Sequence, residues 1–413
     1  MNIAIIITIC TLLLIAYVFS ITAPRTRIPS VILLLLLGWI VRQAADFLEL
    51  DIPRLTPLLP ILGTIGLVLI VLEGSLELEL DKSKTPIIKR SFLVALIPIL
   101  VLGIALAYLF QHVSGASLRV SLINAIPLCV ISSAIAIPSA KNLSPANREF
   151  SVYESTLSDI LGVLFFNFMA LNTVINLSAF LHFGLQLVIM ILVSFVATIG
   201  LSYLLSRIDH HVKHTPIILL LILIFAVSEV YHLPALIFIV IFGLFIGNFD
   251  QLKRFRWAQQ FRAEALDKEV NKFKEITMEA AFVVRALFFL LFGYLIETAE
   301  ILNPETSVWA VGIVVLIFLI RALQLKVYGL KLRPLVFLAP RGLITILLFF
   351  TIPVGSTIPV MNKSLIMQVI VLSALVMMVG MMTTRTEKPE EKSLIEEKEE
   401  TKVTEVPYSE TSS

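Results

Sequence analysis

Long apolar runs separated by short polar segments make up most of the chain. A bilayer core about 30 Å thick is spanned by roughly 20 apolar residues of helix. Thirteen runs are candidates, so we predict an all-α polytopic membrane protein with about thirteen transmembrane helices. The candidate spans are residues 2–21, 28–42, 57–76, 91–111, 120–140, 149–174, 183–206, 215–230, 233–248, 277–297, 307–328, 334–356 and 364–382.

The eighth and ninth runs are separated only by the sequence YHLP, so one long helix is an alternative to two spans. Basic residues concentrate in cytoplasmic loops. One set of alternate loops carries twenty Lys and Arg residues, and the intervening loops carry four. Fusing the two runs would move the later basic loops to the other side, so the charge pattern favours two spans. It also predicts that the N-terminus lies outside and the C-terminus in the cytoplasm.

Two polar segments divide the chain further. Residues 250–276 form the one long internal loop, a cytoplasmic linker that is either an amphipathic helix on the inner membrane surface or a solvated helical connection. Residues 384–413 are rich in Glu, Lys, Ser and Thr with few apolar positions, which is typical of disorder. We therefore predict a membrane domain at 1–383, with halves at about 1–206 and 207–383, followed by a disordered cytoplasmic tail.

The two halves share a pattern that suggests an internal repeat. Proline and glycine stand nine residues apart in the second span, as Pro29 and Gly38, and again in the ninth span, as Pro234 and Gly243. The next spans continue the match, with IVLEGSLELE in the third and FLLFGYLIET in the tenth. The offset is seven spans, and an odd offset reverses the direction through the membrane. Inverted-topology repeats are a recurrent architecture of secondary transporters, in which the site lies near the midplane between the repeats.

The same offset pairs the fifth span, AIPLCVISSAIAIPSA, with the twelfth, FLAPRGLITILLFFTIP. Proline removes a backbone donor and crowds the preceding turn, so both spans are predicted to be broken where they cross. Proline kinks are common in membrane helices, but breaks in corresponding spans indicate a transport site. Candidate site residues at the first break are Ser132 and Ser133, and Arg341 lies at the second.

Composition supports a membrane protein and excludes several other classes. The chain is 58% hydrophobic and 15% charged, whereas soluble domains are nearer half apolar and a quarter charged. The lipid bilayer is therefore an expected partner. A net charge of +2 gives no reason to expect nucleic-acid binding. Cys10 and Cys129 both lie inside apolar runs, so neither a disulfide framework nor a zinc site is expected. We expect no cofactor.

The sixth span contains the stretch YESTLSDILGVLFFNF, which places carboxylates in an apolar run. Asp159 is eleven residues from Arg148 at the inner edge, or about 16 Å along a helix, near the middle of the bilayer. An ionisable residue at that depth costs roughly 2.5 to 3.5 kcal/mol, so it needs a partner or a function. Ser155 and Ser158 add oxygens nearby, and the patch could coordinate a dehydrated cation. A buried structural carboxylate is the alternative.

Five more ionisable residues that bear on the site lie within spans. Glu154 is about 140° around the helix from Asp159, so the two carboxylates can have different roles. A nearby arginine would keep Glu154 charged, and the candidates are Arg285, Arg321 and Arg341. Arg285 could instead extend toward the inner interface. Glu73 lies in the inner third of its span, where it could line an access path from the cytoplasm or form a structural ion pair.

Histidine positions bear on two further hypotheses. A membrane hydrolase built on Ser155 and Asp159 would need a base at the same depth, but His112, His182 and His232 lie in outer loops or at helix ends. We therefore do not expect an enzyme. A second group, of three histidines and an aspartate, lies in a cytoplasmic loop, where it could sense pH, bind a metal adventitiously or be plainly solvated. Its members are Asp209, His210, His211 and His214.

These residues resemble the sodium/proton exchanger family of the monovalent cation:proton antiporter superfamily, in its bacterial thirteen-helix type. The resemblance covers nearly all of the membrane part, to about Thr383. The ion-binding helix of the family carries the motif E-S-L-L-N-D, and residues 154–159 read ESTLSD here. The resemblance implies that Asp159 binds the cation and the proton in alternation, with Ser155 as a further ligand.

The resemblance also implies roles for two arginines. The family pairs the glutamate of its motif with an arginine in a sequence similar to L-I-A-R-V-L, and LIRAL here identifies Arg321 as the partner of Glu154. The G-L-R-G motif of the second crossing helix resembles APRG, which gives Arg341 a structural role.

Two positions depart from the pattern of the family. The first crossing helix usually carries T-D-P at its break, whereas Ser132 and Ser133 stand near that place here without an acid. The asparagine before the essential aspartate is Ser158. A single exchangeable carboxylate implies one proton per monovalent cation.

The function implied by the resemblance is exchange of a monovalent cation, Na⁺ or Li⁺, for H⁺. The cation and the proton would be the transported partners, and the protein would lie in the cell (inner) membrane, crossing it many times, as a homodimer. A K⁺/H⁺ antiporter, or another ion transporter or channel of the same fold, is the alternative.

Overall fold

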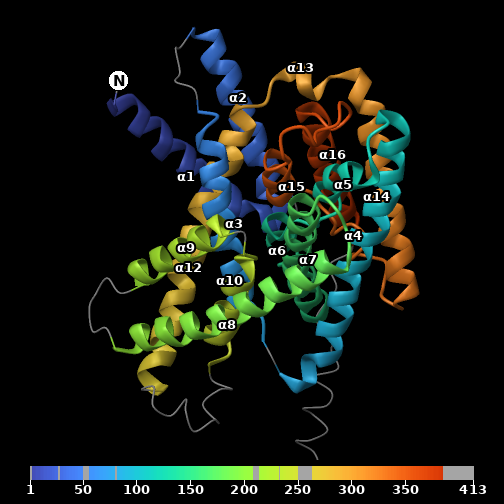
Figure 1. The fold of residues 1–413 in the computed structure, drawn as a ribbon. Coiled ribbons are helices and arrows are strands. Elements are labelled where there is room, and N and C mark those ends of the chain that lie inside the picture. The colour runs from blue at the N-terminus through green and yellow to red at the C-terminus, as the bar shows by residue number, and fades with distance from the viewer. Residues whose placement is uncertain are drawn as a thin grey trace, which may run out of the picture.

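The computed structural model describes residues 2–26, 28–49, 55–79, 81–207, 214–231, 233–249 and 263–384, and the regular structure in these ranges is helical (Figure 1). The helices that begin in the first half are α1 (Asn2–Thr26), α2 (Ser30–Phe47), α3 (Leu58–Glu77), η1 (Lys82–Lys84), α4 (Thr85–Ser114), α5 (Leu118–Ala125), η2 (Ile126–Leu128), α6 (Ser133–Ser139), α7 (Pro145–Leu171) and α8 (Leu177–Arg207). Those of the second half are α9 (His214–Val230), α10 (Leu236–Gly247), α12 (Ala263–Tyr294), α13 (Thr298–Ile301), α14 (Pro304–Val327), α15 (Leu343–Phe350) and α16 (Lys363–Thr383).

The predicted spans coincide with these elements. Each of the thirteen ranges falls on a helix or, for the fifth and twelfth, on a segment that is helical only in part. Nine segments of the described chain are long and apolar enough to cross a membrane, and three shorter apolar helices accompany them. The eighth and ninth runs form separate helices, α9 and α10, as the charge pattern predicts. The all-helical fold class is confirmed, and the total of thirteen crossings stays a prediction.

Of the predicted linker at 250–276, the structure describes only the second part. Residues 250–262 lie outside the described residues, and the remainder belongs to α12, which continues without interruption into the tenth span. Val270 and Phe273 are buried rather than facing a membrane surface, and the Phe273 ring lies 6.0 Å from that of Phe242 in α10. This stretch extends the helix because its apolar side chains have protein partners. From residue 385 onward the predicted tail lies outside the described residues.

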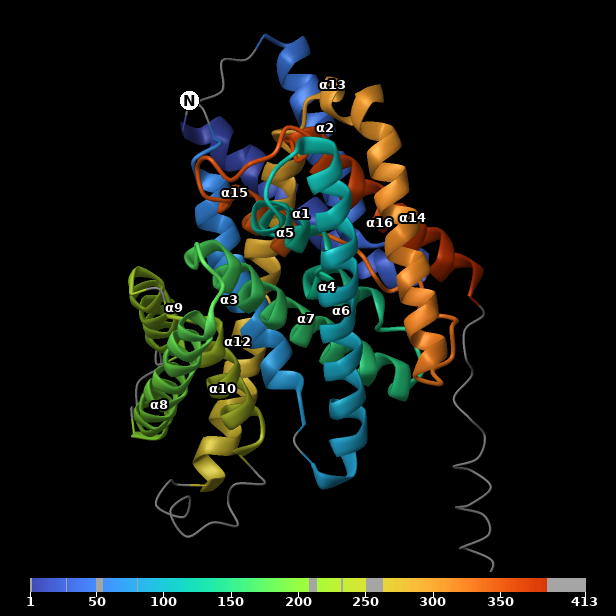
Figure 2. The same cartoon turned by 45° about the vertical axis from the view of Figure 1, so that its right-hand side comes forward.

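The helices pack into two bundles (Figure 2). The scaffold bundle contains α1, α2, α3, α8, α9, α10 and α12, and the crossed bundle contains α4, α5, η2, α6, α7, α14, α15 and α16. Each bundle combines elements from both predicted halves of the sequence. Within the scaffold bundle, α3 contacts α6, α7 and α15, so it forms a main seam between the bundles.

Glycines allow two close helix crossings in the scaffold bundle. A Cβ on Gly38 of α2 would lie 2.2 Å from the Leu290 carbonyl oxygen of α12, and a Cβ on Gly243 of α10 would lie 2.5 Å from Ser75 Cβ of α3. Small residues let helix backbones approach closely in membranes. Under the offset of seven spans, α2 corresponds to α10 and α12 to α3, so the two crossings are repeats of one contact. The glycines of the repeated Pro and Gly pattern therefore mark the same helix crossing in each half of the inverted repeat.

We expect Gly38→Ala to destabilise the protein by about 1–3 kcal/mol, because the added methyl group must push the α2 and α12 backbones apart. The measurement is the midpoint of thermal unfolding of purified protein in detergent. Gly312→Ala in α14 is the matched control, since a Cβ there meets no atom within 4 Å. An unchanged midpoint for Gly38→Ala would show that the crossing is not closely packed.

Two of the linkers between the bundles lie at opposite ends of the molecule (Figure 2). The connection from α3 to α4 contains η1, where Lys84 pairs with Glu79 and lies 2.7 Å from Glu149 of α7. Hydrogen bonds to Glu149 and Glu79 raise the pKa of Lys84. The connection from α12 to α14 contains α13, where Glu300 lies 3.0 Å from Lys363 at the start of α16. Each of these two linkers is thus held by an ion pair near the start of a helix in the crossed bundle.

Candidate functional site

The two predicted breaks are present, and they meet each other. The first spans residues 129–132 between η2 and α6, and the second ends at Gly342, immediately before α15. The Ser132 amide donates a hydrogen bond of 3.0 Å to the Pro340 carbonyl. A Cβ on Gly342 would lie 2.9 Å from Ser132 Oγ, so glycine permits this approach. The chain places two interrupted backbones side by side inside the protein.

Arg341 satisfies backbone groups that the breaks leave without helical partners. Its side chain is buried, and its Nε donates 2.7 Å to the Leu128 carbonyl at the end of η2. Its Nη1 donates 3.0 Å to the Ala339 carbonyl of its own segment. Buried carbonyl groups need such partners because no water replaces the lost helical hydrogen bonds. These contacts agree with a structural role for Arg341.

Asp159 faces the first break from α7. Its Oδ2 accepts hydrogen bonds from Ser133 Oγ and, at 3.3 Å, from the Ser133 amide. The neighbouring Ser158 Oγ accepts 3.0 Å from the Ile131 amide. Asp159 is only 1% exposed, and among the residues that the structure describes its Oδ1 has no hydrogen-bond partner. One carboxylate oxygen is therefore held in place, and the other is available to a proton or a cation.

The remaining serines surround this group less directly. Ser155 Oγ donates 2.7 Å to the Ser151 carbonyl of its own helix, which leaves its oxygen lone pairs unused. Within the described part of the chain, Ser132 Oγ has no hydrogen-bond partner. Ser133 thus hydrogen-bonds directly to Asp159, and Ser158 hydrogen-bonds to the backbone of the same break. Ser155 lies one turn before Asp159 on α7 and bonds to its own helix.

Glu154 and Arg321 form the ion pair that the resemblance implies. The contact is bidentate: Arg321 Nη1 donates to Glu154 Oε1, and Nη2 donates 2.7 Å to Oε2. Arg321 Nη2 also donates 3.1 Å to the Leu335 carbonyl in the second interrupted segment. Both side chains are buried. The pair joins α7, α14 and that segment, and it neutralises Glu154 in the crossed bundle.

Glu73 and Arg285 meet elsewhere, at the seam between the bundles. Arg285 Nη1 of α12 lies 3.6 Å from Glu73 Oε2 of α3. Both line a cavity of about 70 Å³ together with residues of α1, α2, α3, α6 and α7. We call this the inner cavity; its other charged lining residues are Glu77, Lys141 and Arg148. The ion-pair alternative for Glu73 is present, and an access path through the cavity stays a prediction.

One buried hydroxyl has no signal in the sequence. Thr156 lies between Glu154 and Asp159 in the stretch YESTLSD, yet a threonine in a membrane helix is ordinary. In the structure it is 1% exposed, and its Oγ1 has no hydrogen-bond partner in the described ranges.

The histidine group is only partly described. Asp209, His210 and His211 lie outside the described residues. His214 begins α9 and is buried, with Nε2 3.1 Å from Glu269 Oε2 of α12. The expectation of a plainly solvated loop does not hold for His214, because helix packing encloses it.

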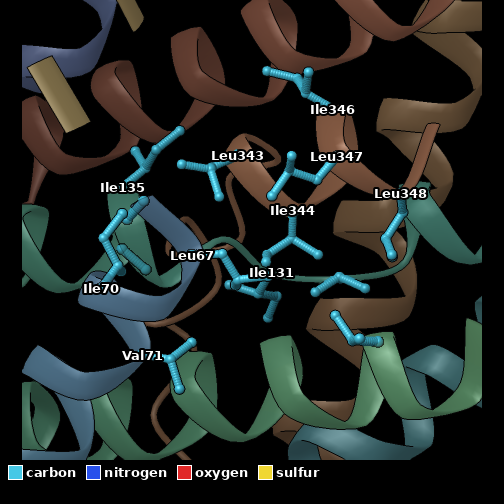
Figure 3. Close-up of a cluster of buried hydrophobic side chains, with 14 of the residues drawn as sticks. Leu67, Ile70, Val71, Ile131, Ile135, Leu343, Ile344, Ile346, Leu347 and Leu348 are labelled. Atoms are coloured by element: carbon cyan, nitrogen blue, oxygen red, sulfur yellow. The ribbon is translucent and has the colours of Figure 1, made fainter. Parts of the chain in front are cut away.

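Apolar side chains enclose the crossing. Figure 3 shows Leu67 and Ile70 of α3, Ile131 of the first break, Ile135 of α6 and Leu343 of α15 gathered in one cluster. All five are buried. Electrostatic interactions are stronger where water is excluded. The hydrogen bonds that Asp159 accepts are therefore stronger than they would be in water.

Comparison with known proteins identifies the family. The family described as "Sodium/hydrogen exchanger, transmembrane" matches residues 9–387. No curated protein matches the chain. A structure of the sodium proton antiporter MjNhaP1 from Methanocaldococcus jannaschii is 18% identical, with a TM-score of 0.65, and the match covers 92% of this chain and 96% of that one. An electron-microscopy structure of the same antiporter is 16% identical, with a TM-score of 0.66 and coverage of 99% and 100%. At these identities the solved structures show the fold, and the match over residues 9–387 shows that the chain belongs to the sodium/hydrogen exchanger family.

Proposed function

We propose that this protein is a secondary active antiporter that exchanges Na⁺ or Li⁺ for H⁺, with the cation and the proton competing for Asp159. The observation that carries the proposal is the environment of this carboxylate. One of its oxygens accepts two hydrogen bonds from Ser133, and the other is buried without a partner among the described residues. An isolated charge in that position is costly, so the carboxylate takes up either a proton or a cation.

Charge balance supports a stoichiometry of one proton per cation. Glu154 is neutralised by Arg321, and the first break carries serines where the family pattern has an acid. Among the buried carboxylates of the crossed bundle that the structure describes, Asp159 then remains for exchange. The oxygens of Ser158 and Ser155, together with carbonyls of the interrupted segments, are further ligands for a dehydrated cation. Binding either ion leaves the site neutral.

The two bundles support alternating access. Asp159 belongs to the crossed bundle, and the inner cavity lies at the seam with the scaffold bundle. A displacement of one bundle against the other would expose Asp159 to the two sides in turn. With the basic loops in the cytoplasm, the inner cavity faces the cytoplasm and the N-terminus lies outside the cell membrane.

Competition has a kinetic signature that tests the proposal. Purified protein in liposomes is given a pH jump in Na⁺, Li⁺ or K⁺, and proton flux is followed over a range of cation concentrations. If one proton competes with one cation, each unit decrease of pH raises the apparent KM for the cation by up to about tenfold. The maximal rate should stay nearly constant.

Other outcomes lead to other functions. Activity with K⁺ and not with Na⁺ or Li⁺ would favour a K⁺/H⁺ antiporter of the same fold. Cation flux that is not coupled to protons would favour a channel. An apparent KM that does not depend on pH would refute competition at a shared carboxylate.

A further inference from the structure

The hydroxyl of Thr156 is unusual among those of α7. Ser151 Oγ and Ser155 Oγ each donate to the carbonyl four residues back, at 2.8 and 2.7 Å. Where water is absent, the hydroxyl groups of Ser and Thr in a helix usually donate this local hydrogen bond to a backbone carbonyl. Thr156 Oγ1 makes no hydrogen bond within the described residues, although the residue is 1% exposed. A buried hydroxyl without a hydrogen-bond partner destabilises the fold by about 1–3 kcal/mol. A ligand that contacts the hydroxyl would offset this cost.

The hydroxyl lies where three helices of the two bundles meet. A Cβ on Gly74 of α3 would be 2.8 Å from Thr156 Oγ1 and 3.6 Å from Ile137 Cδ1 of α6. The hydroxyl therefore faces α3 at a glycine, which itself has no side chain to cover it. Since α3 belongs to the scaffold bundle and Thr156 to the crossed bundle, this oxygen lies on the surface along which the bundles would slide.

The same three helices lead from the inner cavity to Asp159. Glu73, next to Gly74 on α3, lines the inner cavity, and so does Ile137 of α6. One turn earlier on α6, Ser133 holds Asp159. On α7, Thr156 precedes Asp159 by three residues, which is about 4.5 Å along the axis and close to the same face. The hydroxyl thus lies beyond the wall of the inner cavity, on the side of Asp159.

We propose that Thr156 Oγ1 is an oxygen ligand for the monovalent cation as it passes between the inner cavity and Asp159. A hydroxyl oxygen can replace one water of the hydration shell while Asp159 Oδ1 supplies the charge. This inference rests on the proposed antiport function and adds a residue that sets cation affinity. The family motif E-S-L-L-N-D has leucine at this position, so the ligand would be particular to this chain.

The test compares Thr156→Val with Thr156→Ser in liposomes. Valine keeps the shape of threonine and removes the hydroxyl, whereas serine keeps the hydroxyl and removes a methyl group. The apparent KM and maximal rate are measured for Na⁺ and Li⁺ at one pH, with Asp159→Asn alongside. We expect Thr156→Val to raise the apparent KM about tenfold, which corresponds to one lost ligand, with a smaller change in maximal rate. Thr156→Ser should stay within about twofold of wild type.

A second measurement tests binding without transport. Cations that bind the folded protein raise its thermal unfolding midpoint in detergent, and the concentration of Li⁺ or Na⁺ that gives half of this shift should be about tenfold higher for Thr156→Val. A wild-type KM and half-shift concentration in Thr156→Val would overturn the proposal, and so would equal losses in the valine and serine variants, because packing would then explain them.

The two proposals fail in different ways. If Asp159→Asn still exchanges ions at the wild-type rate, the antiport mechanism through Asp159 is wrong whatever Thr156 does. If wild-type protein exchanges ions, Asp159→Asn does not, and Thr156→Val matches wild type, the failure belongs to the Thr156 ligand alone.

Discussion

Asp159→Asn is expected to reduce cation-dependent proton flux by about 100-fold or more, because the amide neither ionises by releasing a proton nor offers a negative charge. The amide oxygen can still accept the hydrogen bonds that Ser133 donates to Asp159 Oδ2. We therefore expect the variant to fold, and its thermal unfolding midpoint should stay near that of wild type. Loss of transport with retained stability would separate an exchange site from a structural carboxylate.

The measurement is proton flux after a pH jump in liposomes containing Na⁺ or Li⁺, normalised to the amount of protein inserted. Asp46→Asn makes the same chemical change in α2, at a half-exposed pair with Arg42. It should leave the flux unchanged. Flux at the wild-type level in Asp159→Asn would contradict the central assignment, and the exchange site would have to be sought elsewhere in the crossed bundle.

Arg321→Ala is expected to lower the free energy of unfolding by about 3–5 kcal/mol, because it leaves Glu154 buried without its cation. The substitution also frees the Leu335 carbonyl, which accepts from Arg321 at 3.1 and 3.3 Å. The ion pair and this carbonyl tie α7 and α14 to the second interrupted segment. The loss should therefore reach the packing of the two breaks as well as the local contact.

Thermal unfolding in detergent provides the measurement, and two controls interpret it. Arg42→Ala breaks the half-exposed pair with Asp46 and should cost less than about 1 kcal/mol. The double variant Glu154→Gln with Arg321→Met removes both charges, so it should be more stable than Arg321→Ala alone. If the single and double variants unfold at the same temperature, the uncompensated charge is not the source of the instability.

Several features of the site could be predicted from single stretches of sequence. A carboxylate in the middle of an apolar run must lie within the membrane, so Asp159 is marked by its own neighbours. Prolines at corresponding places in the fifth and twelfth spans mark both breaks. The glycines of the second and ninth spans mark helix crossings, although their partners on α12 and α3 appear only in the packing.

Other features depend on contacts between distant segments. Three arginines were candidates for Glu154, and the structure pairs it with Arg321, 167 residues away, while Arg285 lies against Glu73. Of the serines near Asp159, the one that donates to it is Ser133, 26 residues earlier, and Ser155 turns to its own helix. The described part of the predicted linker, residues 263–276, is continuous with α12, and its Phe273 packs against Phe242 of α10.

By itself, the sequence determined the membrane class, the approximate spans and the repeat, because these follow from the local cost of placing each residue in hydrocarbon or water. The tertiary structure alone decided which groups satisfy one another: Ser133 with Asp159, Arg341 with the broken ends, and Gly74 opposite Thr156. Which groups become partners depends on the distance between two backbones and on their relative register. Both are set by the packing of the whole bundle.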